Sequence, residues 1–193
     1  MSHSIISADL SGRRICILAT HGFEQSELIE PRDALRKAGA HVDVVSPQQG
    51  EIRGWKGKDW GESVPVDAAL DGVKAADYDA LVLPGGQINP DLLRVDTDAI
   101  ALIKAFADAG KPIAAVCHAP WLLIEAGLVS GKTLTCYKSI RTDLENAGAT
   151  FVDREVAIDG NLITSRSPDD LPAFNAAIAT AVHAAANSNI ELV

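Results

Sequence analysis

Short apolar runs alternate with longer amphipathic segments along most of the chain. The runs are rich in small and β-branched residues and have the length of buried strands. They occupy residues 14–19, 42–45, 78–83 and 111–116. Between them, apolar residues recur at helical spacing up to a glycine, which predicts helices at residues 26–38, 97–109 and 119–126.

The C-terminal third is predicted to continue this alternation with shorter elements. Strands are predicted at residues 131–136, 151–158 and 162–165. Helices are predicted at residues 139–147, where Ser139 caps the first turn, and from residue 167 to about residue 182. Asp159-Gly160-Asn161 has the turn chemistry of a β-hairpin, so it is predicted to join the last two strands.

Residues 48–65 do not fit the alternation. This stretch is rich in glycine and contains Trp55 and Trp60, so we expect an irregular excursion with one short hairpin at residues 51–55. Its aromatic side chains either pack the excursion against the body of the protein or contact another subunit.

Alternating strands and helices predict a doubly wound α/β fold, with a mostly parallel sheet and helices on both faces. At 193 residues the chain has room for one domain of this kind, which we expect to span residues 13–185. Residues 1–12 are expected to form a flexible arm, and residues 186–193 a frayed tail.

Composition argues against several classes of function. The formal net charge of -9 and the scattering of the 17 basic residues argue against a nucleic-acid surface. The cysteines show no C-x-x-C spacing, so we expect no metal, no cofactor and no disulfide framework, and a reducing cytoplasm fits best. No run is long enough to span a bilayer and the first residues lack the apolar core of a signal peptide, so no membrane partner is expected.

Cys117 is the strongest candidate for chemistry, because it lies at the join of a predicted strand and a predicted helix. A side chain at such a tight turn is pushed out of the sheet towards the start of the helix, as in a nucleophile elbow. The free N–H groups there are expected to lower the pKa of the thiol. The alternative is an inert, buried cysteine.

Two other features share this edge of the predicted sheet. Glu27 follows the first strand, and Gly85-Gly86 follow the strand that ends at residue 83. Ligands bind at the carboxyl ends of strands in open parallel sheets, so this clustering favours a catalytic Cys117. Glu27 has a structural alternative, in which it only complements the dipole of its helix.

Four segments together resemble the DJ-1/PfpI superfamily, and most closely its PfpI-like branch. They are residues 22–28 (GFEQSEL), 81–86 (LVLPGG), 115–120 (AVCHAP) and 164–171 (TSRSPDDL). The resemblance extends over nearly the whole chain and implies the flavodoxin-like sandwich of class I glutamine amidotransferases. It also implies self-association into a homodimer or a higher homo-oligomer.

The resemblance implies a role for several groups. The nucleophile of the family falls on Cys117, its histidine on His118, and the acid beside the thiol on Glu27. The oxyanion donors fall on the backbone N–H groups of Gly86 and His118. By position, Asp91 of a neighbouring subunit completes the triad.

Three positions are open to other interpretations. Consecutive residues that enter a helix point about 100° apart, so His118 needs unusual elbow geometry to act on Cys117. Without it, His118 is a hydrogen-bonded, half-buried imidazole. Without the resemblance, Asp91 is interpreted as a cap or turn residue. Ala119 stands where many PfpI-like members have glycine, which would narrow the elbow.

These expectations describe a cysteine-dependent enzyme whose thiolate attacks an electrophilic carbonyl. The resemblance implies two chemistries: removal of methylglyoxal or glyoxal adducts from thiols and amines, related to glyoxalase activity, and hydrolysis of peptide or amide bonds. We favour small carbonyl substrates, because the sequence shows no groove for a polypeptide. The alternative is a non-catalytic stress protein, redox-sensing or chaperone-like, in which Cys117 is oxidised to a sulfinate held by Glu27.

Overall fold

The fold is built on one seven-stranded sheet. The computed structural model describes residue 6 and residues 8–188. The strands of the sheet are β1 (Arg14–Leu18), β2 (His41–Ser46), β5 (Ala68–Ala69), β6 (Ala80–Leu83), β7 (Ile113–Val116), β10 (Val156–Asp159) and β11 (Leu162–Ser165). Their spatial order is β10-β11-β7-β6-β1-β2-β5. Every neighbouring pair is parallel except β10 with β11, which confirms the predicted mostly parallel sheet.

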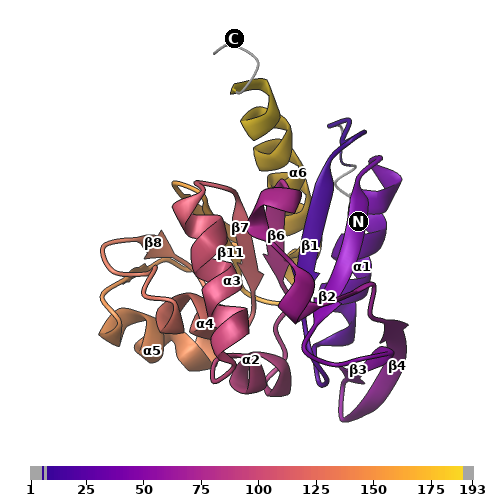
Figure 1. Cartoon of the computed structure of the whole chain (residues 1–193). Coiled ribbons are helices and arrows are strands. Elements are labelled where there is room, and N and C mark those ends of the chain that lie inside the picture. Colours follow the sequence, from indigo (N-terminus) through magenta and orange to yellow (C-terminus); the bar gives the residue numbers. More distant parts are fainter. Residues whose placement is uncertain (1–5, 7, 189–193) are drawn as a thin grey trace.

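Helices cover both faces of the sheet (Figure 1). One face carries α1 (Gln25–Lys37) and α6 (Leu171–Ser188), which also pack against each other. The other face carries α3 (Thr97–Asp108), α4 (Pro120–Glu125) and α5 (Arg141–Asn146). The short α2 (Ile88–Leu93) follows β6. None of the helices in the described part of the chain is both long and apolar enough to cross a membrane.

The alternation of side chains along each strand divides the core into two layers. In β1, Ile15 and Ile17 pack in the layer of α1 and α6, whereas Cys16 and Leu18 pack in the layer of α3 and α4. All four side chains are fully buried. Successive residues of a strand point to opposite faces, so a sheet covered on both sides needs the continuous apolar runs that the sequence shows.

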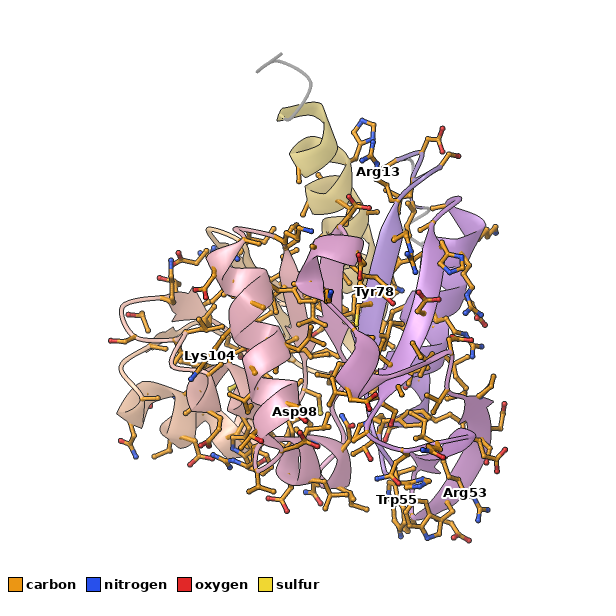
Figure 2. The ribbon with its side chains drawn as sticks, viewed as in Figure 1. Arg13, Arg53, Trp55, Tyr78, Asp98 and Lys104 are labelled. Atoms are coloured by element: carbon orange, nitrogen blue, oxygen red, sulfur yellow. The ribbon has the colours of Figure 1, made fainter. Side chains whose placement is uncertain are left out.

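Residues 48–65 form a longer hairpin than predicted, composed of β3 (Glu51–Lys56) and β4 (Asp59–Pro65). Strand β3 is bonded to the body of the protein, because Trp55 N–H donates to Phe23 O at 2.7 Å and Gly22 N–H donates to Arg53 O at 2.8 Å. The hairpin lies at the same end of the molecule as α2 (Figure 1). Figure 2 shows Arg53 and Trp55 on it, at the end opposite Arg13.

Two of the predicted C-terminal strands are wrong in extent. Residues 131–136 contain only β8 (Thr133–Leu134), which pairs with β9 (Thr150–Phe151) outside the main sheet. The predicted strand at residues 151–158 is interrupted between β9 and β10, because the three charged side chains of residues 153–155 are exposed. Four short 3-10 helices complete the chain: η1 (Leu70–Gly72), η2 (Ala75–Asp77), η3 (Lys138–Ile140) and η4 (Pro168–Asp170).

Part of the expected N-terminal arm is packed onto the body. Leu10 is fully buried, and its N–H donates to Ala38 O at 2.8 Å. The apolar residues before the first strand form too short a stretch to predict an element, so the sequence did not indicate this contact. Helix α6 continues to Ser188 and extends beyond the sheet (Figure 1). Residues 1–5 and 7 of the expected arm, and residues 189–193 of the expected tail, lie outside the described residues.

Leu10→Ala is expected to lower the free energy of unfolding by about 2 to 5 kcal/mol, because it leaves a cavity in the layer of α1 and α6. Urea unfolding measures this change. Leu92→Ala is the matched control, since Leu92 is 48% exposed, and its expected effect is within about 0.5 kcal/mol. Equal effects of the two substitutions would show that Leu10 does not belong to the folded core.

Candidate active site

Cys117 occupies a strained turn between β7 and α4. Its φ is +63°, and it is the one residue other than glycine with a positive φ in the described part of the chain. This left-handed conformation costs a residue with a Cβ about 1 to 2 kcal/mol. Hydrogen bonds hold it on both sides, since Cys117 N–H donates to Ser165 O at 3.0 Å and Tyr137 N–H donates to Cys117 O at 2.9 Å. The predicted elbow is therefore present, and α4 begins at Pro120, one residue after the predicted start of this helix.

His118 faces the thiol despite being its neighbour in the chain. Its Nδ1 lies 3.1 Å from Cys117 Sγ. The left-handed backbone of Cys117 provides the unusual geometry that this contact needs. The imidazole stacks on Tyr137 at 4.8 Å between ring centroids and meets Trp121 edge-on at 5.3 Å. Burial lowers the pKa of His118, so the imidazole is neutral at neutral pH.

Ser139 contacts the second ring nitrogen of His118 through its hydroxyl group. Its Oγ lies 3.1 Å from His118 Nε2. The prediction that Ser139 caps a helix is wrong: Ser139 lies in η3, and α5 has Ile140 at its N-cap position with no side-chain cap. A serine just before a predicted helix is a typical N-cap residue, so the sequence pattern did not indicate that Ser139 contacts the histidine.

Glu27 is a fully buried acid in the first turn of α1. One oxygen, Oε2, accepts a hydrogen bond from Gly85 N–H at 2.8 Å. The other, Oε1, has no partner among the nitrogens and oxygens of the described residues, and the carboxyl group interacts with the thiol of Cys117. Burial raises the pKa of Glu27 to about 8, and the charge of Glu24 adds to this effect. Glu27 therefore holds a proton at neutral pH and can donate it to sulfur.

The thiol of Cys117 is more buried than the sequence suggested. The residue is 6% exposed. Burial and the adjacent carboxylate of Glu27 raise its pKa, whereas the backbone N–H groups of Gly86 and His118 lower it. The predicted lowering of the thiol pKa is wrong in its net direction, because the donors at the helix start do not outweigh burial beside an acid. Thiol and acid share one negative charge at most, so their ionisation belongs to the pair.

Gly85 and Gly86 bring the backbone close to the thiol. A Cβ at Gly85 would lie 2.6 Å from Glu27 Oε2 and 2.7 Å from Cys117 Cβ, so only glycine fits. Gly86 has φ +79°, and its N–H is one of the two donors to sulfur. The other donor is His118 N–H. Both N–H groups favour the charged form of the sulfur, and their role as oxyanion donors stays a prediction.

Asn89 fixes this glycine loop, and the sequence did not single it out. The side chain is fully buried. Its Oδ1 accepts from Thr20 N–H at 2.7 Å, and its Nδ2 donates to Pro84 O at 2.8 Å. The amide thus connects the ends of β1 and β6, the two strands that present Glu27 and the glycines.

A pocket of about 400 Å³ opens above the thiol. Cys117, His118 and Glu27 form its floor. Trp55 and Gly57 of the hairpin form a wall. Glu24 and Tyr137 also line it. The hairpin wall was not predicted, because the aromatic residues of residues 48–65 carried no periodic signal.

Asp91 is not brought to this pocket within one chain. It lies in the first turn of α2, is exposed, and is absent from the described residues that line the pocket. Its role in a neighbouring subunit stays a prediction. Among the described residues no group of three or more His, Cys, Asp or Glu side chains is arranged to hold a metal ion.

Curated relatives match most of this chain. General stress protein 18 of Bacillus subtilis (strain 168) is 46% identical over 85% of this chain and 94% of its own length. Protein/nucleic acid deglycase 2 of Escherichia coli (strain K12) is 46% identical over 84% of this chain and 94% of its own length. Putative cysteine protease YraA of Bacillus subtilis (strain 168) is 44% identical over 84% of this chain and 94% of its own length.

Solved structures share the fold. Drosophila melanogaster DJ-1beta superposes with a TM-score of 0.79 at 32% identity, covering 92% of this chain and 97% of its own. A two-domain protein of Anabaena variabilis, with DJ-1/ThiJ/PfpI-like and ferritin-like domains, superposes with a TM-score of 0.83 at 36% identity. That match covers 87% of this chain but 47% of the two-domain protein. The DJ-1/PfpI family model matches residues 13–181, and the chain therefore belongs to the DJ-1/PfpI family.

Proposed function

We propose that this chain is a cysteine-dependent hydrolase that removes small dicarbonyl adducts, such as those of methylglyoxal, from thiols and amines. The observation that carries the proposal is the contact of 3.1 Å between Cys117 Sγ and His118 Nδ1 at a left-handed elbow. Two of the relatives support it through their names, protein/nucleic acid deglycase and putative cysteine protease. The pocket of about 400 Å³ suits a small adduct better than an extended polypeptide.

The first step is ionisation of the thiol and attack. Neutral His118 is placed to take the thiol proton, while Glu27 keeps its own proton and donates a hydrogen bond to the thiolate. Sulfur then adds to the carbonyl carbon of the substrate. The oxygen that becomes negative is stabilised by the N–H groups of Gly86 and His118, the two backbone donors beside the sulfur.

The overall reaction for a methylglyoxal hemithioacetal balances without an external oxidant. In the pocket the hemithioacetal releases its thiol, which leaves with the hydroxyl proton and restores the aldehyde, and the sulfur of Cys117 adds to that carbon to form a new hemithioacetal. A proton then moves from this carbon to the adjacent ketone carbon and the hydroxyl proton moves to the ketone oxygen, which leaves a lactate thioester on Cys117. Water hydrolyses the thioester to lactate, so one carbon is oxidised while its neighbour is reduced. His118 and Glu27 are the groups within reach for these proton transfers.

The redox-sensing alternative is not favoured. A peroxide sensor relies on an accessible thiol of low pKa. Cys117 is 6% exposed, and burial raises the pKa of its thiol. A neutral histidine in contact with the thiol is also of no use to a sensor.

Cys117→Ser is expected to reduce activity about a thousandfold or more, because the hydroxyl is a far weaker nucleophile in this site. Lactate formation from the hemithioacetal of methylglyoxal and 2-mercaptoethanol measures it, and casein hydrolysis tests the peptidase alternative. Cys136→Ala is the control, since Cys136 is buried outside the pocket. Residual activity equal to that of the unsubstituted protein would rule out thiol chemistry.

Glu27→Gln is expected to remove a pH dependence of stability. Between pH 5 and 8 the folded protein keeps the Glu27 proton that the unfolded chain has released. Stability therefore falls as pH rises through this window, by up to about 1.4 kcal/mol per pH unit. Urea unfolding at several pH values measures the difference between the two proteins, in which other groups cancel. Parallel curves would show that Glu27 is not a protonated acid.

Ser139→Ala is expected to lower kcat about tenfold with little change in KM, because His118 Nε2 loses the hydrogen bond that orients the ring. Ser139→Thr keeps a hydroxyl and should restore most of the rate. A purely structural role would instead lower the urea midpoint in both variants. An unchanged kcat in Ser139→Ala would contradict the positioning role.

A further inference from the structure

The pocket beside Cys117 carries negative charge without a lysine or arginine. Apart from the thiol and the phenol of Tyr137, the ionisable side chains among its described lining residues are Glu24, Glu27 and His118. Glu27 holds its proton at neutral pH and His118 is a neutral imidazole there. Glu24 is therefore the group that gives the pocket its charge.

Glu24 is held in place by the backbone on two sides. It occupies the N-cap position of α1, its N–H donates to Gly85 O at 3.2 Å, and it forms an isolated parallel bridge with Trp55. Burial raises the pKa of its carboxyl group, and the nearby groups of Ser26 and Gln25 oppose that rise, although the side chain does not cap the helix through a hydrogen bond. Glu24 thus lines the pocket with a carboxyl group that is already partly desolvated.

No cation among the described residues pairs with Glu24. Lys56 and Lys58 flank Gly57 at the turn of the hairpin, but both are exposed and neither lines the pocket. Arg53 donates to Gly61 O at 3.1 Å and lies over the ring of Trp60, so it is engaged on the hairpin itself. A half-buried carboxylate without a positive partner attracts a cationic ligand.

We propose that Glu24 makes the pocket selective for substrates that carry an ammonium or guanidinium group near the reactive carbonyl, and that it discriminates against substrates that carry a carboxylate. The proposal rests on the proposed function, in which Cys117 is the attacking group. Trp55 borders the same space, and an indole ring also favours a cation. Dicarbonyl adducts of molecules that keep a second, unreacted amine, such as polyamines, belong to the favoured class.

A cationic substrate would also promote its own attack. The charge of Glu24 contributes to the high pKa of Glu27, and the charge of Glu27 raises that of Cys117. A positive group beside Glu24 offsets the first of these effects. The pair of acid and thiol then loses the first of its two protons at lower pH, so the thiolate beside a protonated Glu27 is more abundant when the preferred substrate is bound.

The first test measures the charge at Cys117 without requiring turnover. Cys117 is modified by 2-(trimethylammonium)ethyl methanethiosulfonate and by 2-sulfonatoethyl methanethiosulfonate, and each rate is divided by that of a free thiol. Cys16 and Cys136 are at most 1% exposed, and mass spectrometry confirms the modified residue. We expect the ratio of cation to anion rates to exceed one, and to fall roughly tenfold in Glu24→Gln.

Two further variants control this experiment. Glu30→Gln makes the same charge change on the exposed side of α1, away from the pocket, and should alter the ratio by less than about twofold. Glu24→Asp keeps the charge, so its ratio should stay above that of Glu24→Gln. Glutamine retains an acceptor for the N–H groups at the start of α1, and the urea midpoint verifies folding.

The second test compares turnover of three methylglyoxal hemithioacetals, made with 2-(dimethylamino)ethanethiol, 2-mercaptoethanol and 3-mercaptopropionate. We expect kcat/KM for lactate formation to decrease from the cationic to the anionic adduct, and Glu24→Gln to reduce this preference.

The two tests separate the failure of each proposal. An unchanged modification ratio in Glu24→Gln, or equal kcat/KM for the three adducts, would overturn the selectivity. A reduced ratio without turnover of any adduct would overturn the proposed function and support the charge preference of the pocket.

Discussion

The left-handed backbone of Cys117 is the constraint on which the site depends. Such a conformation costs about 1 to 2 kcal/mol and persists only where the surroundings enforce it. Here they do, since Ser165 O at the end of β11 and Tyr137 N–H bind the backbone of Cys117 from two sides. These partners belong to the sheet and to the chain after β8, so the strain is held by the fold. The result is a thiol that meets the ring of the next residue at 3.1 Å.

Burial of Glu27 beside this thiol determines how the site can be charged. Two negative charges cannot coexist in so small a buried volume, so the acid keeps a proton when sulfur ionises. Gly85 makes the arrangement sterically possible, because any Cβ there would collide with both side chains. Burial and the proximity of Glu27 to the sulfur also explain why the thiol is less acidic than that of an exposed cysteine at a helix N-terminus.

The sequence was sufficient for the parts of the site that carry a local signal. An apolar run before Cys117, two glycines after a strand and an acid in a first helical turn each have a pattern, and parallel topology brings them to one edge. Ser139 and Asn89 could not be found in this way. Their partners lie 21 residues away, for the bond to His118, and 69 residues away, for the bond to Thr20. The prediction that the pKa of the Cys117 thiol is lowered was wrong for a similar reason, because the depth of burial is a property of the packed fold and not of a local pattern.

The hairpin wall is attached to the body separately from the elbow. Gln25 is 8% exposed, and its Oε1 accepts from Glu62 N–H at 2.7 Å while its Nε2 donates to the Glu62 carboxylate at 3.1 Å. This attachment joins β4 to the start of α1, next to Glu24, and none of its atoms belongs to the elbow. Substitutions in the hairpin can therefore change the charge and shape of the pocket without disturbing Cys117 or His118. Such separation lets one reaction centre serve different substrates within a shared fold.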